Sequence, residues 1–265
     1  MKARNIFARY FLKSKEKPPT HFLKFLGRGS CFATDHAAAF FVTSKNDFVL
    51  IDCSEQTYQR LKNEFNLASY NNVYVYITHT HGDHVGGLGV LIQFAFYALQ
   101  KHITVIAPSR EVKNDIETLF KIEGVTPEMY TLLFAQELIP ALTTKLDFGI
   151  PEEVLAISIP TIHVPTLNGK CFGFQFKVND KIIVYTGDTA TLEPFLPYLS
   201  YGSELYVDTS AAYKSDVHMW LPDMLPTLIS FTERGIKVYL MHLDDVSKAQ
   251  NLIKNIQAIE IVQTI

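Results

Sequence analysis

Three histidines and one aspartate crowd into a single hexapeptide, His79-Thr80-His81-Gly82-Asp83-His84. Their imidazole nitrogens and carboxylate oxygens suit Zn²⁺, Mn²⁺ or Fe²⁺, and no thiolate is needed. The hexapeptide follows the apolar run 73–77, which has the length and composition of a buried strand. Gly82 allows a tight backbone bend that would turn the neighbouring side chains toward one point. The sequence therefore predicts a metal site at the end of this strand.

Three later residues could complete such a site, because each lies at or near the end of a predicted strand. Asp188 follows the predicted strand 181–185, and His242 follows the predicted strand 238–241. His163 lies two residues before Pro165 in an irregular segment. A lone histidine is more often structural than a ligand, but together with the hexapeptide these residues favour a shared metal site.

The hexapeptide resembles the His-x-His-x-Asp-His signature of the metallo-β-lactamase superfamily, and the three later residues fall in the order of that pattern. The resemblance covers nearly the whole chain, from about Phe22 to His242. It implies an α/β fold of four layers (αββα), in which two mixed β-sheets are sandwiched between helices and metals bind at the sheet edge. It also implies the metal ligands: His79, His81 and His163 for a first ion, Asp83, His84 and His242 for a second ion, and Asp188 as the bridge between them.

The resemblance further implies two divalent metal ions, with zinc as the first choice and manganese or iron as alternatives. Two neighbouring cations can share a water and depress its pKa, which gives a hydroxide nucleophile near neutral pH. Asp83 would orient this hydroxide or take a proton from it.

Two local motifs are similar to the branch of the superfamily that contains ribonuclease Z and a cyclic phosphodiesterase. Residues 25–30 resemble its opening Leu-Gly-x-Gly-Ser, and residues 51–61 resemble its Asp-Cys-Gly-Glu-Gly-Thr segment. Enzymes similar to ribonuclease Z also carry an acid after a strand and a downstream histidine that protonates the leaving oxygen. Asp208 and His218 are the residues of this chain that match that pair, with Asp208 orienting the imidazole.

The function that these residues favour is therefore that of a hydrolase. We expect a phosphodiesterase or nuclease that acts on RNA or on a nucleotide-like or cyclic phosphodiester. The chain has no glycine- and lysine-rich stretch like the tRNA-gripping arm of ribonuclease Z, which argues against tRNA 3′ processing. Hydrolysis of an ester, thioester or lactone on the same fold is the alternative within enzymes. A metal-binding module without turnover is the alternative outside them.

Apolar patterning predicts the elements that position these residues. Strand composition occurs at 21–26, 39–43, 48–52, 73–77, 103–107, 154–159, 171–178, 181–185, 205–207 and 238–241. Helical spacing occurs at about 55–65, 86–99, 109–150, 222–234 and 246–256. Since no Pro/Gly/Ser-rich linker divides the chain, we predict one domain over 1–265 with a helical insertion at about 109–150.

Composition narrows the class of protein and the compartment in which we expect it. The 265 residues are 48% hydrophobic and 19% charged, as expected for a globular core, and the three cysteines cannot all pair. With no secretory leader and no apolar run long enough to span a bilayer, we expect a soluble, cytoplasmic protein without a membrane partner. A homodimer is a further expectation from the resemblance. Residues 1–28 carry eight basic side chains against Glu16 alone, which fits either a solvated segment or a patch for phosphate-bearing partners.

Overall fold

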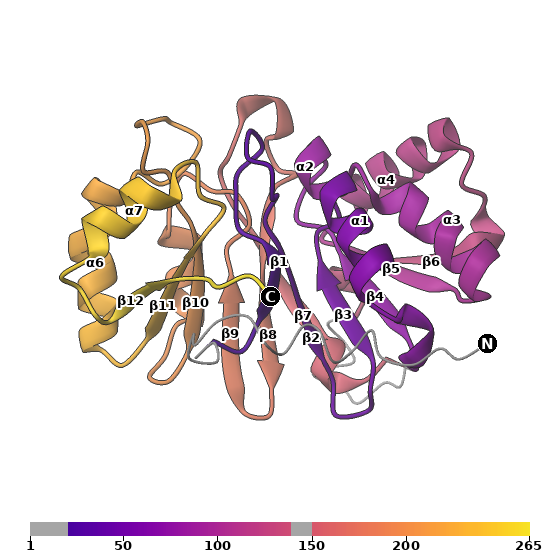
Figure 1. Ribbon diagram of the computed structural model, residues 1–265, viewed down its shortest axis with the longest axis horizontal. Helices are drawn as coiled ribbons and strands as arrows, with labels where there is room; N and C mark the ends of the chain where they lie inside the picture. Colours follow the sequence, from indigo (N-terminus) through magenta and orange to yellow (C-terminus); the bar gives the residue numbers. More distant parts are fainter. Residues whose placement is uncertain (1–20, 139–149) are drawn as a thin grey trace, which may run out of the picture.

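The computed structural model describes residues 21–138 and 150–265, and within them the chain forms two six-stranded mixed sheets (Figure 1). The first sheet has, in spatial order, β1 (Lys24–Gly27), β2 (Ala38–Val42), β3 (Phe48–Ile51), β4 (Val73–Tyr76), β5 (Ile103–Ala107) and β6 (Tyr130–Phe134). The second has β12 (Ile259–Ile261), β11 (Lys237–Met241), β10 (Glu204–Asp208), β9 (Lys181–Tyr185), β8 (Phe172–Val178) and β7 (Ala156–Pro160).

Helices cover the outer side of each sheet, so the layers run helix, sheet, sheet, helix (Figure 1). Beside the first sheet lie α1 (Glu55–Glu64), α2 (Gly82–Val85), α3 (Leu88–Leu99) and α4 (Arg110–Glu123). Beside the second sheet lie α6 (Leu221–Glu233) and α7 (Val246–Ile253). Short 3₁₀ turns connect the elements at Leu67–Ser69, Pro127–Met129, Glu152–Val154, Pro165–Leu167 and Glu193–Tyr198. This is the predicted αββα architecture.

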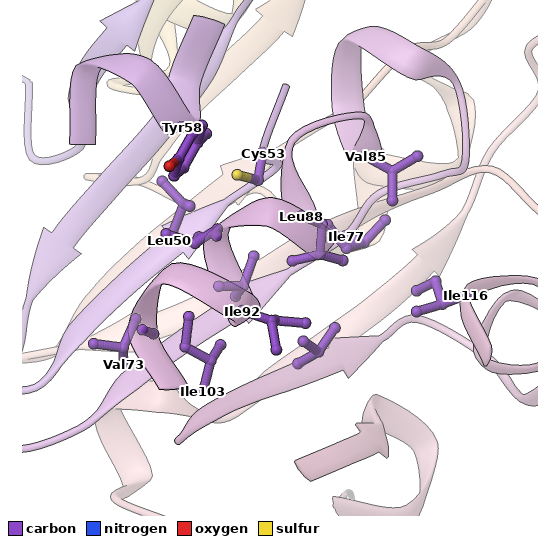
Figure 2. Close-up of a cluster of buried hydrophobic side chains, with 14 of the residues drawn as sticks. Leu50, Cys53, Tyr58, Val73, Ile77, Val85, Leu88, Ile92, Ile103 and Ile116 are labelled. Atoms are coloured by element: carbon purple, nitrogen blue, oxygen red, sulfur yellow. The ribbon is translucent and has the colours of Figure 1, made fainter. Parts of the chain in front are cut away.

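Three buried apolar clusters hold the layers together. Between the sheets, Tyr76 packs edge-on against Phe174 and Phe176. Outside the first sheet, strand residues such as Leu50 meet Leu88 and other residues of α3 (Figure 2). A third cluster lies between the second sheet and α6 and α7. Burying a large apolar side chain contributes about 1.5–3 kcal/mol, so these clusters supply most of the drive for folding.

Strand direction decides where the chemistry-bearing loops meet. Strands β3 to β6 are mutually parallel, and so are β9 to β12. Strand β7 is antiparallel to β8, which is antiparallel to β9, so β7 and β9 run the same way. Since parallel strands end at one edge of a sheet, the segments after β7, β9, β10 and β11 emerge together.

The predicted helical insertion at 109–150 is partly wrong. Residues 110–123 form helix α4, but 130–134 form strand β6, which pairs in parallel with β5. Leu132 packs into the outer cluster and Leu133 into the cluster between the sheets. A strand covered on both faces needs consecutive apolar residues, and such a run resembles helical spacing. Residues 139–149 of the predicted insertion lie outside the described residues, as do residues 1–20 of the basic N-terminal segment.

No helix in the described ranges is both long and apolar enough to cross a bilayer.

Glycine is required after the hexapeptide rather than within it. Gly82 begins α2, and a Cβ there would meet nothing within 4 Å, so the expected need for glycine at this bend is not found. At Gly87 a Cβ would lie 2.2 Å from the Ser54 carbonyl oxygen. Gly87 N donates to Cys53 O (2.9 Å), and Cys53 N donates to His84 O (2.7 Å). Gly87 thus lets the metal-binding segment lie directly against the turn after β3.

We expect Gly87→Ala to lower the free energy of unfolding by about 1–3 kcal/mol, because the new methyl group must displace backbone that is already packed. Urea unfolding in the presence of a chelator measures this without a contribution from metal binding. Gly82→Ala is the matched control and should change stability by less than about 0.5 kcal/mol. Equal effects at the two glycines would contradict the assignment.

Candidate metal centre

The structure brings all seven sequence-predicted ligands together at the carboxyl-end edge of the sheets. His79, His81, Asp83 and His84 follow β4, His163 follows β7, Asp188 follows β9 and His242 follows β11. All are buried except the half-buried His81. They fall into two groups that share Asp188, and the donor atoms of each group lie within 4.8 Å of one another.

The first group contains His79, His81, His163 and one oxygen of Asp188. His81 Nδ1 lies 2.9 Å from His79 Nε2 and 3.4 Å from His163 Nε2. Asp188 Oδ2 lies 3.8 Å from His79 Nε2 and 3.6 Å from His163 Nε2. Tetrahedral zinc ligands with bonds of about 2 Å lie about 3.3 Å apart, so these four atoms have the spacing of one coordination sphere.

The second group contains Asp83, His84, His242 and the other oxygen of Asp188. His84 Nε2 lies 3.2 Å from Asp83 Oδ2 and 3.3 Å from Asp188 Oδ1. His242 Nε2 lies 3.4 Å from each of these two oxygens. Asp188 therefore divides its two oxygens between the groups, as a bridging ligand would.

Two buried polar atoms at the centre of the site are positioned to bind a cation. Within the described part of the chain, neither His84 Nε2 nor Asp188 Oδ1 has a hydrogen-bond partner. Buried polar atoms without partners are costly, and metal coordination is the usual way in which a histidine and carboxylate cluster is satisfied. The donor set of nitrogens and carboxylate oxygens suits divalent transition metals.

The protonation states of His79 and Asp188 suit ligation directly. Burial lowers the pKa of His79 well below its ordinary value, so that its imidazole is neutral, as a metal ligand must be. Burial alone would raise the pKa of Asp188, but the surrounding histidines, His242 and His84 foremost, hold it well below its usual range. The bridge is therefore a carboxylate. Burial lowers the pKa of His84 and His242, but the nearby carboxylates, Asp188 foremost, outweigh it and raise the pKa, so a bound cation would displace a proton from each ring.

Asp52 supports the second group from behind, and sequence reasoning assigned it no role. Its Oδ2 lies 2.8 Å from His84 Nδ1, and its carboxylate accepts hydrogen bonds from the Thr78 backbone N–H (2.8 Å) and hydroxyl (2.9 Å). Asp52 is fully buried and has a left-handed backbone, with φ of 64°. The available signal was a lone acid directly after the apolar strand 48–51.

Asp208 joins two histidines. Its Oδ2 accepts from His218 Nδ1 at 2.8 Å, and its Oδ1 lies 3.1 Å from His242 Nδ1. The His218 ring lies 4.9 Å from the ring of His163 and 5.2 Å from that of His242. Burial lowers the pKa of His218, but the Asp208 carboxylate outweighs this and the pKa is raised. The predicted pair is thus in contact, beside both ligand groups.

A cavity of about 250 Å³ opens over the two groups. His81, Asp83, His163, Asp188, His218 and His242 line its floor and walls. The remaining lining residues are Ser30, Cys31, Phe32, Val164, Thr209, Ser210, Tyr213, Ser215, Val217 and Asp244. No lysine or arginine of the described residues is among them, so any strong positive charge in the cavity has to come from bound cations.

This fold and its paired ligand groups define a protein of the metallo-β-lactamase fold. The metallo-β-lactamase fold protein YhfI from Bacillus subtilis superposes with a TM-score of 0.67 at 16% identity, covering 91% of this chain and 96% of YhfI. Human tRNase Z, short form, superposes with a TM-score of 0.59 at 17% identity, covering 91% of this chain and 96% of tRNase Z. Zn²⁺-bound PqqB from Methylobacterium extorquens superposes with a TM-score of 0.64 at 10% identity, covering 91% of this chain and 97% of PqqB.

The family follows from the sequence comparison. The family model described as anti-Pycsar protein Apyc1 matches residues 22–264, and the chain belongs to this family. Apyc1 of Bacillus phage BSP38 is 27% identical over 233 residues, which cover 84% of this chain and 89% of the relative. Ribonuclease Z of Nanoarchaeum equitans is 30% identical over 161 residues, which cover 59% of this chain and 46% of that relative. The match thus spans about half of that ribonuclease Z.

We expect Asp188→Ala to lower the zinc content at both positions, because each ligand group loses one of its four donors. His81→Ala is the comparison variant, since it removes a donor from the first group alone. Metal-to-protein ratios after dialysis against limiting zinc, read by mass spectrometry of the metal, measure the loss. Two full equivalents retained by Asp188→Ala would refute the bridge.

We expect Asp52→Asn to weaken zinc binding by about 10–100-fold, because the amide cannot replace the carboxylate that orients His84. Competition with a fluorescent zinc chelator measures the affinity. Asp47→Asn is the control, since Asp47 is equally buried but bonds to Thr43 and Asn72 away from the site. If both variants bind zinc equally well, Asp52 has no role in positioning the ligand.

Proposed function

We propose that this chain is a metal-dependent phosphodiesterase whose substrate is a small nucleotide-like or cyclic phosphodiester. The observation that carries the proposal is the meeting of two ligand groups and a hydrogen-bonded Asp208–His218 pair at one cavity. A site that only bound metal would not need an additional imidazole, held by a carboxylate, beside the ligands. Hydrolysis of a phosphodiester needs one, because its alkoxide leaving group must be protonated.

Two divalent ions fit the site. His79, His81 and His163 would hold the first, Asp83, His84 and His242 the second, and Asp188 would bridge them. Such ions supply Lewis-acid stabilisation of the phosphoryl oxygens and lower the pKa of water, and zinc, manganese and iron all accept these donors.

Asp83 lines the cavity and remains anionic. Burial raises its pKa, but the neighbouring imidazoles of His242 and His84 outweigh this and lower it. A carboxylate of such low proton affinity is a poor general base. We therefore assign it the orientation of a water through an accepted hydrogen bond rather than the removal of its proton.

His218 is assigned as the general acid. Its Nδ1 is engaged by Asp208, so Nε2 is the ring nitrogen that can donate a proton to the leaving oxygen. The side chain is 20% exposed, which leaves it accessible from the cavity that it lines. Asp208 holds the imidazole in one orientation and stabilises its charged form.

The lining of the cavity supports a small substrate over RNA. Two divalent ions and the carboxylates of Asp83 and Asp188 leave enough positive charge for one phosphodiester. An RNA strand brings several phosphates, which proteins neutralise with lysine and arginine. No described residue of the lining supplies either. Relatives named ribonuclease Z keep RNA as the alternative to be tested.

We expect the zinc- or manganese-loaded chain to hydrolyse 3′,5′-cyclic mononucleotides, and His218→Ala to lower kcat by about 10²–10⁴-fold. With a bis(nitrophenyl) phosphodiester the loss should be much smaller, because nitrophenolate leaves without a proton. Steady-state kinetics on the two substrates measures the difference, and metal content is checked in parallel.

His102→Ala is the matched control, because His102 is exposed and lies directly before β5, at the opposite end of the strand from the site. Equal losses on both substrates would refute the acid role of His218. Hydrolysis of precursor tRNA in preference to cyclic mononucleotides would establish the RNA alternative. Failure of metal-loaded protein on every phosphodiester would leave esters, thioesters and lactones, and then metal binding without turnover.

A further inference from the structure

Two exposed aromatic side chains stand at the mouth of the cavity. Phe32 is 88% exposed and Tyr213 is 57% exposed, and both line the cavity that holds the ligand groups. They come from different loops, one before β2 and one after β10. We infer that Phe32 and Tyr213 form a stacking clamp for the nucleobase of the substrate, an inference that rests on the proposed phosphodiesterase function.

The loop that carries Phe32 is anchored to Leu243 on its N-terminal side and is closed by a backbone hydrogen bond within the loop. Ser30 N donates to Leu243 O (3.0 Å), and Leu243 N donates to Arg28 O (2.8 Å). Within the loop, Gly29 N donates to Asp35 O (2.7 Å). The exposure of Phe32 is therefore a feature of a hydrogen-bonded loop, and an exposed phenyl ring in such a loop gains nothing for folding.

The loop that carries Tyr213 is held by one carboxylate. Asp244 Oδ1 accepts the backbone N–H groups of Ala211 (2.7 Å) and Ala212 (3.0 Å), and its Oδ2 accepts the Ser210 hydroxyl (2.6 Å). Three accepted hydrogen bonds fix the backbone directly before Tyr213. Its ring is thereby presented at the cavity although its side chain is largely exposed.

Both loops are anchored to the segment 242–244, which also supplies one of the metal-site ligands. His242 belongs to the second ligand group, Leu243 pairs with the loop of Phe32, and Asp244 holds the loop of Tyr213. The backbones from which the two aromatic rings extend are therefore fixed relative to the ligand groups. Such a layout suits a substrate in which a planar group and the phosphodiester are a short, fixed distance apart, as in a mononucleotide.

A nucleobase fits these surroundings better than an aliphatic group. Stacking on aromatic side chains contributes about 1–3 kcal/mol per base and tolerates every base, because each has a π-face. Hydroxyl groups of Ser30, Thr209 and Ser215 also line the cavity and can meet the polar edge of a base. Thr209 Oγ1 already donates to Val207 O (2.9 Å), and Ser215 Oγ accepts from the His218 backbone N–H (3.3 Å). A base can use the remaining hydrogen-bonding capacity of these hydroxyls, whereas an acyl chain cannot.

The test compares substrates with and without a base. A purine 3′,5′-cyclic mononucleotide is set against the cyclic ribose phosphate that lacks the purine. We expect Phe32→Leu and Tyr213→Leu each to raise KM for the mononucleotide by about tenfold and to change kcat by less than about twofold. KM for the base-free compound should stay unchanged, and Phe32→Tyr and Tyr213→Phe should behave as the parent. Leucine keeps the bulk, and an unchanged zinc content shows that the site is intact.

If the leucine variants leave KM unchanged, or raise KM equally for both compounds, the proposed stacking clamp is wrong. The proposed phosphodiesterase function is not affected by that result. If the parent hydrolyses no phosphodiester, the proposed function fails and calorimetric binding of a purine nucleoside monophosphate decides the clamp. Binding that weakens about tenfold in the leucine variants, with ribose 5-phosphate as the unaffected control, supports it. Absence of binding, or equal binding by all variants, overturns it.

Discussion

The buried carboxylate of Asp188 is the constraint on which the whole site depends. Its Oδ2 faces His79 and His163, and its Oδ1 faces His84 and His242. A buried carboxylate is costly unless opposite charge surrounds it. The second sheet delivers Asp188 after β9, whereas the first sheet delivers the hexapeptide after β4. The charge pairing therefore requires the edges of the two sheets to meet, and the aromatic packing between the sheets makes that meeting rigid.

Two further buried carboxylates set the direction in which the histidines point. Asp52 engages Nδ1 of His84 and Asp208 engages Nδ1 of His242, so that both rings present Nε2 to Asp188. Outer carboxylates of this kind fix the tautomer of a ligand and raise its basicity. Asp208 also holds His218, so the same side chain orients one ligand and the candidate acid. A change at Asp208 would therefore affect ligation and proton transfer together.

The sequence was most informative where the chemistry is local. The hexapeptide and the polar residues after strands 181–185 and 238–241 revealed the centre, because ligands follow strands whose ends share an edge. Asp52 was not assigned, because its contact with His84 depends on the parallel pairing of β3 with β4 rather than on any spacing. The segment 130–134 was misread, because a strand covered on both faces and a buried helix have the same apolar content.

The segment 242–244 fixes the position of the recognition loops relative to the ligand groups. His242 has a left-handed backbone, with φ of 53°, which breaks the path of β11 and sends Leu243 and Asp244 toward two different loops. The anchors are backbone hydrogen bonds and one carboxylate, so they fix the loop bases without specifying the residues at their tips. Binding loops on a rigid scaffold can change their tip residues at little structural cost. Substrate choice in this architecture therefore resides in the side chains at positions such as 32 and 213, while the distance from those side chains to the ligand groups is set by the fold.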